Sequence, residues 1–273
     1  MKLLNEILGT KYPIIQGGMA NIATGEFAAA CSNAGALGLI GAGGMRDADT
    51  LRENIRRCKA LTDQPFGVNI MLMHPLADEF AKIVVEEGVQ VVTTGAGNPG
   101  KYIQMWKEAS IKVIPVVAAA VLAKHLEPLG VDAIIAEGTE SGGHVGEMTT
   151  MALVPQVVDA VNVPVIAAGG IADGRQLAAA FALGACGAQV GTCLLVSEEC
   201  PIHENYKAAH TIGDLFCFFD LRRQGAAVGA DRVFGKIRFP VAGVSSGDAP
   251  HAAAGRHGSG QPAQGNAHAH AAL

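Results

Sequence analysis

Charge, aromatic residues and long apolar runs are all scarce in this sequence. Only 16% of its 273 residues are charged and 5% are aromatic, whereas 49% are apolar and 35 are glycine. The 20 lysine and arginine residues against 25 aspartate and glutamate residues give a formal net charge of -5. This charge provides no basic surface for a nucleic-acid backbone, so we expect no nucleic-acid partner. The apolar content also argues against intrinsic disorder.

No apolar run is long enough to cross a bilayer. The longest uncharged stretch, Val113 to Ala123, is well short of the roughly 20 residues that a membrane-spanning helix needs, and Pro115 interrupts it. Near the N-terminus, Glu6 and Lys11 lie too close together for the apolar segment of a secretory signal peptide. We therefore expect a cytoplasmic protein with no membrane partner.

The usual residue patterns of metal sites and hydrolytic enzymes are missing as well. The six cysteines form no C-x-x-C pair and have mostly apolar neighbours: Cys31, Cys58, Cys186, Cys193, Cys200 and Cys217. This pattern favours buried free thiols over a metal or redox site. No Cys-His pair, Ser-His-Asp set or metal-ligand cluster has a recognisable spacing. We expect no resident metal, and we expect a cofactor to carry out the difficult chemical step.

Eight short apolar runs recur along the first 192 residues and predict strands. They are 13–16, 37–40, 66–70, 89–93, 112–116, 133–136, 164–167 and 188–191. Continuous apolar runs are typical of parallel strands that are buried on both faces. Segments with helical spacing lie between them, for example 47–61, 76–87 and 152–160. Eight alternating units favour a TIM (β/α)8 barrel, with an open doubly wound sheet as the alternative.

Glycines gather where the predicted strands end. The clusters are Gly17-Gly18, Gly41 with Gly43-Gly44, Gly95 with Gly97, Gly138 with Gly142-Gly143, Gly169-Gly170 and Gly191. In a barrel these strand ends surround one mouth, where backbone N–H groups of glycine can approach a ligand closely. The alternative for any one cluster is a tight turn without a ligand. Six clusters at the same end of successive strands favour a ligand site.

One strand–turn–helix segment has the form of a phosphate site. In VIAAGGIADG, residues 165–174, a buried strand leads through Gly169-Gly170 into a helix start. Backbone amides in the last two loops of a barrel commonly bind phosphate, so we predict a cradle of Gly169, Gly170, Gly191 and Thr192. The segment lacks the G-x-G-x-x-G pattern of dinucleotide sites. A mononucleotide phosphate is the favoured ligand.

His144 is the strongest candidate for acid–base chemistry. It follows Gly142-Gly143 in AEGTESGGHVGEMTT, in the predicted loop after the sixth strand. An imidazole exchanges protons near neutral pH, so a general acid or proton relay is reasonable here. Glu137 and Glu140 flank this loop and could orient His144 or bind a cation, with solvated carboxylates as the favoured alternative. His74, in MLMHP, is interpreted as a loop or channel-lining residue.

Three further side chains could surround a flat heterocycle. Asn69, at the end of the third strand, carries a neutral amide that can hydrogen-bond a ring without adding charge. The alternative is an amide that bonds its own turn. Gln16 and Met19, in IIQGGMA, are candidates for the wall beneath the same ring.

Seven motifs in order resemble one enzyme family. PIIQGGMA, PFGVNIMLMHP, VVTTGAGNP, VIPVV, IAEGTESGGHVGEMTTM, PVIAAGGIADG and QVGT are similar to the FMN-dependent enoyl-acyl-carrier-protein (ACP) reductases of the second type, the FabK family, over residues 1–207. The resemblance implies a TIM barrel with FMN at its mouth. It also implies reduction of trans-2-enoyl-ACP to acyl-ACP in fatty-acid elongation, with NADH or NADPH as reductant and hydride from reduced flavin N5. Some members respond to a monovalent cation and many are homodimers.

The resemblance also assigns residues. His144 matches the histidine that assists protonation of the substrate. The matching cofactor-binding positions are Gly17, Gly18, Met19, Asn69, Glu137, Gly142, Gly143, Ala168, Gly169, Gly170, Gln189, Gly191 and Thr192. Two alternatives stay open. One is a nitronate monooxygenase, which uses FMN and oxygen, and the other is a flavin-binding barrel without turnover.

The last part of the chain departs from the family pattern. From residue 246 to 273, 18 of 28 residues are alanine, glycine or histidine, which cannot build a core. We expect 1–207 to form the FMN barrel and 208–273 to be an atypical, poorly ordered tail in place of the family's substrate-covering domain and last helix. Our hypothesis is a shift of reading frame near Lys207, and the alternative is a natural His-rich metal-binding or linker tail. The coding DNA across codon 207 distinguishes them.

Overall fold

The structure is a computed structural model that describes residues 2–143 and 145–212. Its strands are β1 (Ile14–Gln16), β2 (Gly38–Gly41), β3 (Phe66–Met71), β4 (Val91–Gly95), β5 (Lys112–Val117), β6 (Ile134–Glu137), β7 (Val165–Ala168) and β8 (Gly187–Val190). Its helices are α1 (Leu4–Leu8), α2 (Gly25–Ala34), α3 (Ala48–Leu61), α4 (Ala77–Glu86), α5 (Gly100–Glu108), α6 (Ala120–Leu126), α7 (Thr150–Val158), α8 (Gly174–Ala182) and α9 (Glu204–Ile212), with 3-10 turns at Ala42–Gly44, Glu127–Leu129 and Thr192–Leu194. Strands and helices alternate as the apolar pattern predicts.

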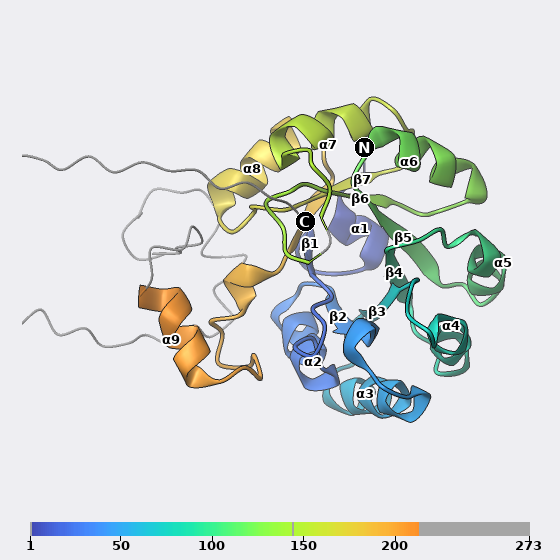
Figure 1. Cartoon of the computed structure of the whole chain (residues 1–273), viewed down its shortest axis with the longest axis vertical. Coiled ribbons are helices and arrows are strands. Elements are labelled where there is room, and N and C mark those ends of the chain that lie inside the picture. The colour runs from blue at the N-terminus through green and yellow to red at the C-terminus, as the bar shows by residue number, and fades with distance from the viewer. Residues whose placement is uncertain (1, 144, 213–273) are drawn as a thin grey trace, which may run out of the picture. The chain divides into compact units, whose positions relative to one another are not determined.

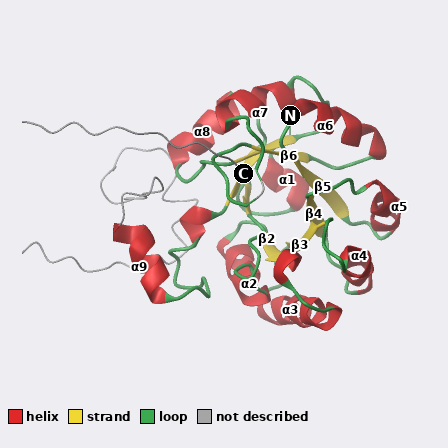
Figure 2. Ribbon diagram, viewed as in Figure 1, coloured by secondary structure: helices red, strands yellow, loops and turns green. Residues whose placement is uncertain are grey.

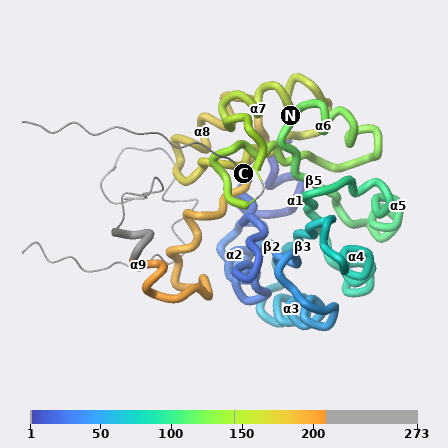
Figure 3. The backbone as a smooth tube through the Cα atoms, in the orientation of Figure 1, coloured from blue at the N-terminus to red at the C-terminus, as the bar shows by residue number. Residues whose placement is uncertain are grey.

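The strands form a parallel barrel, which confirms the predicted TIM fold. The eight-stranded sheet has the order β1-β8-β7-β6-β5-β4-β3-β2, and every pairing is parallel. The helices surround the strands in Figure 2, and the chain colour advances steadily around the ring in Figure 3. The predicted strand runs differ from the observed ones by a few residues at their ends. Such differences are expected because apolar runs mark burial rather than hydrogen bonding.

The barrel closes between β1 and β2 with the help of a side chain. One bridge joins Ile15 to Leu37, and the N–H of Gln16 donates to the Leu37 carbonyl at 2.9 Å. The next donor on β2, the N–H of Leu39, bonds the Gln16 Oε1 at 2.9 Å. The amide of Gln16 therefore continues the ladder where the backbone of β1 turns away.

Two layers of apolar side chains hold the barrel together. Outside the strands, helices bury apolar stripes; α3 buries Leu51, Ile55 and Cys58, as its spacing predicts. Inside the strands, a second cluster contains Leu39, Ile114, Ile135 and Ile166 together with Leu4 and Leu8 of α1. Figure 1 shows α1 within the ring of strands. This helix closes the end of the barrel at which the strands begin.

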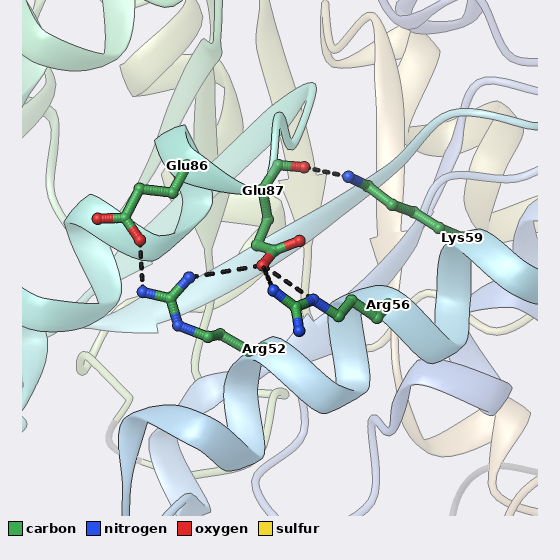
Figure 4. Close-up of polar contacts among 5 residues, drawn as sticks. All are labelled: Arg52, Arg56, Lys59, Glu86 and Glu87. Atoms are coloured by element: carbon green, nitrogen blue, oxygen red, sulfur yellow. Dashed lines mark hydrogen bonds and ion pairs between the residues drawn. The ribbon is translucent and has the colours of Figure 1, made fainter.

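The outer helices α3 and α4 are joined by an ion-pair network (Figure 4). The Glu87 carboxylate accepts from Arg56 at 2.8 Å and from Arg52 at 3.4 Å, and Arg52 also bonds Glu86. The Lys59 ammonium donates to the Glu87 carbonyl. The Arg56 hydrogen bond is the main cause that lowers the pKa of Glu87. The network therefore stabilises this helix pair through a carboxylate that is ionised at neutral pH.

Five of the six cysteines lie in the described residues, and all five are buried free thiols as predicted. Burial raises the pKa of Cys58 to about 12 and that of Cys186 to about 11, so both thiols are protonated at neutral pH. Cys217 lies outside the described residues. Among the described helices, none has the length and apolar character of a membrane span.

Candidate functional site at the barrel mouth

Predicted site residues from three neighbouring strands lie in one row at the barrel mouth. Glu137 of β6 pairs in register with Ala168 of β7, and Ala168 pairs with Gln189 of β8. Adjacent parallel strands are about 4.8 Å apart, so the two polar side chains lie either side of a small alanine. Gln189 Oε1 is buried and has no hydrogen-bond partner within the described part of the chain. This row therefore contains a buried acceptor, Gln189 Oε1, that no described residue uses.

The loop after β1 lies beside β8 and, across the barrel sheet, beside β3. A Cβ added to Gly17 would lie 3.5 Å from Gln189 Cγ, and one added to Gly18 would lie 2.3 Å from Asn69 Cβ. A Cβ on Gly191 would lie 3.8 Å from Met19 Sδ. Three successive loop residues therefore each lie beside another predicted site residue, which only the closed barrel brings together.

Two amide side chains predicted near a ring have different surroundings. Gln16 is fully buried and bonds backbone groups, through Oε1 to the Leu39 N–H and through Nε2 to the Gly17 carbonyl. Its amide thus joins strands rather than forming a wall. Asn69 is half-buried, and its Nδ2 donates to Thr93 Oγ1 of β4 at 2.9 Å. That bond ties the Asn69 amide of β3 to the neighbouring strand β4, whereas the alternative predicted that the amide bonds the backbone of its own turn.

The Gly169-Gly170 turn needs glycine for its own conformation. Gly169 has a φ of +101°, and a Cβ there would lie 2.8 Å from Thr150 Oγ1 and 2.9 Å from the Gly138 carbonyl. An L side chain is disfavoured by both the φ and the contacts. The turn therefore packs tightly against the loop that follows β6. Its role in phosphate binding stays a prediction.

The start of helix α8, which follows this turn, already has its own cap. Asp173 accepts from the Gln176 N–H at 2.9 Å, and Gln176 Oε1 accepts from the Ala172 and Asp173 N–H groups at 2.7 and 2.9 Å. A phosphate at this helix end would meet the Asp173 carboxylate. The predicted cradle is thus confined to the turn itself and to Gly191 with the exposed Thr192, which begins the 3-10 turn after β8.

Glu137 and Glu140 have different environments, although the loop sequence favoured solvated carboxylates at both positions and only the family resemblance assigned Glu137 to the cofactor. Glu137 ends strand β6 and is half-buried, and burial raises its pKa. Glu140 is exposed as expected, but its Oε2 accepts from the Thr150 N–H at 2.8 Å and from Thr150 Oγ1 at 2.9 Å. Burial would raise the pKa of Glu140, but these bonds outweigh it and lower the pKa.

The loop after β6 is described on both sides of His144, and His144 itself lies outside the described residues. Gly142 and Gly143 are exposed, and a Cβ at either would meet nothing within 4 Å. His74 lies in the loop after β3, as predicted. Its ring stacks on Phe80 with centroids 5.0 Å apart, and its Nδ1 accepts from the Leu76 N–H at 3.1 Å. These contacts suit a loop residue.

The mouth residues fit FMN. The buried Gln189 Oε1 needs a donor, which the N–H of a flavin pyrimidine ring can supply. Ala168, whose side chain is a single methyl group, lies between Glu137 and Gln189 in this row. Within 2–143 and 145–212, no group of three or more histidine, cysteine or acidic side chains is arranged to hold a metal ion.

One residue that the sequence argument missed is Thr150, the first residue of α7. Besides Glu140, its hydroxyl lies 2.9 Å from the Gly169 carbonyl oxygen and 3.2 Å from that of Ala168. The signal that could have found it is the threonine pair in EMTTM before an apolar helix, because threonine favours helix starts.

Comparison with known proteins identifies the family. The nitronate monooxygenase family model matches residues 1–215. The chain belongs to the nitronate monooxygenase family. Members of this family and of FabK are FMN enzymes.

Solved structures of family members superimpose on the barrel. The chain is similar to FabK from Thermotoga maritima, at 52% identity and a TM-score of 0.76, over 78% of this chain and 68% of the other. It is also similar to a nitroalkane oxidase from Streptomyces ansochromogenes, at 30% identity and a TM-score of 0.70, over 76% and 72% of the two chains.

Curated relatives carry different names. The chain is 39% identical to a (3aS,4S,5R,7aS)-5-hydroxy-7a-methyl-1-oxo-octahydro-1H-indene-4-carboxyl-CoA dehydrogenase of Rhodococcus jostii, over 75% of this chain and 58% of that protein. It is 37% identical to a probable nitronate monooxygenase of Staphylococcus saprophyticus, over 77% and 73% of the two chains. The chain spans about three fifths of the first of these relatives. The predicted boundary at residue 207 falls within α9, and residues 213–273 lie outside the described structure.

Proposed function

We propose that this protein is an FMN-dependent reductase of trans-2-enoyl groups carried on ACP, with NADH or NADPH as the source of electrons. The observation that carries the proposal is the likeness to FabK, at 52% identity over 78% of the chain. The seven motifs that resemble the enoyl-ACP reductases support it, since they occur in order on strands of one parallel barrel and the loops that follow them.

Bound FMN would supply the hydride. The chain's own residues would hold FMN. Its phosphate would be bound by backbone N–H groups of Gly169, Gly170, Gly191 and Thr192. Gln189 would accept a hydrogen bond from the ring, and Asn69, fixed by Thr93, would bond its edge. Burial raises the pKa of Glu137, so its carboxyl is protonated more easily than a solvated one. His144 would give the proton to the α-carbon of the substrate.

Nitronate oxidation is the second candidate, because the matched family model and several curated relatives carry that name. The two reactions need different co-substrates, so one preparation of the FMN-loaded full-length protein can be tested for both. Oxidation of NADH or NADPH that depends on a crotonyl-ACP thioester is expected. Oxygen uptake with an alkyl nitronate and no thioester-dependent oxidation would instead assign the oxygenase. Bound flavin with neither reaction would show a flavin-binding barrel without turnover.

The role of His144 gives a sharper test. We expect His144→Ala to lower thioester reduction by about 100-fold or more, because a positioned general acid contributes at least that much. The rate at which NADH reduces bound FMN, measured as the loss of flavin absorbance, should change little, since this step needs no proton from His144. An equal loss in both half-reactions would refute the proton-donor role.

A further inference from the structure

The loop between β6 and α7, residues 138–149, is closed at its base by hydrogen bonds. The Thr139 N–H donates to the Met148 carbonyl at 2.9 Å, and Ser141 Oγ donates to the Gly138 carbonyl at 2.8 Å. The Glu140 carboxylate bonds both the N–H and the hydroxyl of Thr150. These bonds bring the two ends of the loop together, so the positions between them, which include Gly142 and Gly143, project from a fixed base.

The Thr150 hydroxyl also contacts the neighbouring loop. It lies 2.9 Å from the Gly169 carbonyl oxygen, and there is no room for a Cβ at Gly138 or Gly169, where one would lie 2.2 or 2.8 Å from Thr150 Oγ1. A hydroxyl has one hydrogen to donate, so the Glu140 carboxylate and the Gly169 carbonyl compete for it. A single side chain therefore couples the base of the β6–α7 loop to the Gly169-Gly170 turn.

We propose that Thr150 and Glu140 are positioning residues: together they form a latch that holds the β6–α7 loop against the Gly169-Gly170 turn and sets the geometry in which FMN is bound. The FMN part of this inference rests on the proposed function. The latch itself rests only on contacts among described residues. The lowered pKa of Glu140 supports it, because an ionised carboxylate forms the stronger hydrogen bonds to Thr150.

The chain contains a matched pair without the extra contact. At the start of α3, the Thr50 N–H and hydroxyl both bond the Asp47 carboxylate, at 2.7 and 2.8 Å. In both places a threonine N–H and a threonine hydroxyl donate to one carboxylate. Among the described contacts, Thr50 makes no bond to either loop of the latch. Thr50→Val is therefore a control for the loss of a helix-start hydroxyl alone.

The test compares Thr150→Val, Thr150→Ser and Thr50→Val in the full-length protein. FMN affinity is measured by quenching of flavin fluorescence, and the loop is followed by amide hydrogen exchange of residues 138–149 without FMN. Thr150→Val should raise the FMN Kd about tenfold and speed loop exchange by a similar factor, because it removes the shared hydroxyl. Thr150→Ser, which keeps the hydroxyl, should stay within about twofold of the wild type. Thr50→Val should change neither quantity.

Glu140→Gln is the second variant, and it tests the latch if Thr150→Val does not fold. Its amide oxygen can still accept one bond from Thr150 but carries no charge, so we expect a several-fold rise in Kd and faster loop exchange. Wild-type values for both Thr150→Val and Glu140→Gln would overturn the latch. Equal effects of Thr150→Val, Thr150→Ser and Thr50→Val would overturn it too. If the wild type binds no FMN, the proposed function fails, and loop exchange alone decides the latch.

Discussion

The two ends of the barrel are made by the same strands but have opposite chemistry. At the closed end, α1 inserts Leu4 and Leu8 into an apolar cluster, and the Leu4 N–H bonds the Cys186 carbonyl at 2.9 Å. At the mouth, polar residues such as Asn69 and Glu137 lie at or near the ends of the strands, and glycines replace large side chains. The closed end is filled with apolar side chains, whereas the mouth carries polar side chains and glycines that a ligand can approach.

Because of this difference, the closed end should mainly determine the stability of the fold, and the mouth should mainly determine ligand binding. The apolar cluster at the closed end contributes to folding whether or not a ligand is present, because it removes apolar surface from water. Gln189 Oε1 at the mouth, which has no hydrogen-bond partner among the residues that the structure describes, lowers stability until a donor reaches it. Substitutions at the two ends should therefore change different measured quantities, as barrels in general conserve function at one end and stability at the other.

The largest effect is expected at the closed end. Leu4 is fully buried, and a Cβ on Gly187 would lie 2.6 Å from its Cβ. Leu4→Ala leaves a cavity there, and we expect it to lower the free energy of unfolding by about 2–5 kcal/mol in urea titrations. FMN affinity under native conditions should stay unchanged. A parallel loss of FMN affinity would show that the two ends are not independent.

A smaller effect with the opposite signature is expected at the mouth. Gly169→Ala places a methyl group against Thr150 and Gly138 and forces alanine into a positive φ. We expect the FMN Kd to rise about tenfold, because the turn must shift by a few tenths of an ångström. Gly88→Ala is the matched control, since Gly88 has a φ of +59° but a Cβ there meets nothing within 4 Å. If both variants weaken FMN binding equally, backbone strain rather than the turn is responsible.

The smallest effect concerns the half-buried Glu137. Because burial raises its pKa, the folded protein binds this proton more tightly than the unfolded chain, and stability falls as pH rises from below 4.5, the ordinary pKa of glutamate, through the folded pKa. The side chain of Glu137→Gln cannot ionise, so the variant does not lose stability in this way as pH rises. We expect the variant to match the wild type at low pH and to be more stable at neutral pH, in thermal melts without FMN. Equal pH profiles would show that burial does not shift the pKa of Glu137.

Much of the architecture could be predicted because it depends on local patterns. Apolar runs and glycine clusters located all eight strands and the mouth, and the spacing of Leu51, Ile55 and Cys58 located a buried helix face. The roles of Gln16 and Thr150 could not be predicted. Each depends on partners 18 or more residues away, such as Leu39 and Gly169, whose distance is set by barrel closure.

The sequence by itself determined the repeated strand–helix units, the glycine-rich strand ends and the resemblance to the FMN reductases. Tertiary structure alone decided which polar groups are satisfied and which are left open. Gln16 is used to close the ladder, Thr150 joins two loops, and Gln189 keeps a buried oxygen that no described residue partners. The physical reason is that hydrogen bonding depends on atoms within about 3.5 Å, and only the closed barrel brings distant strands to that distance.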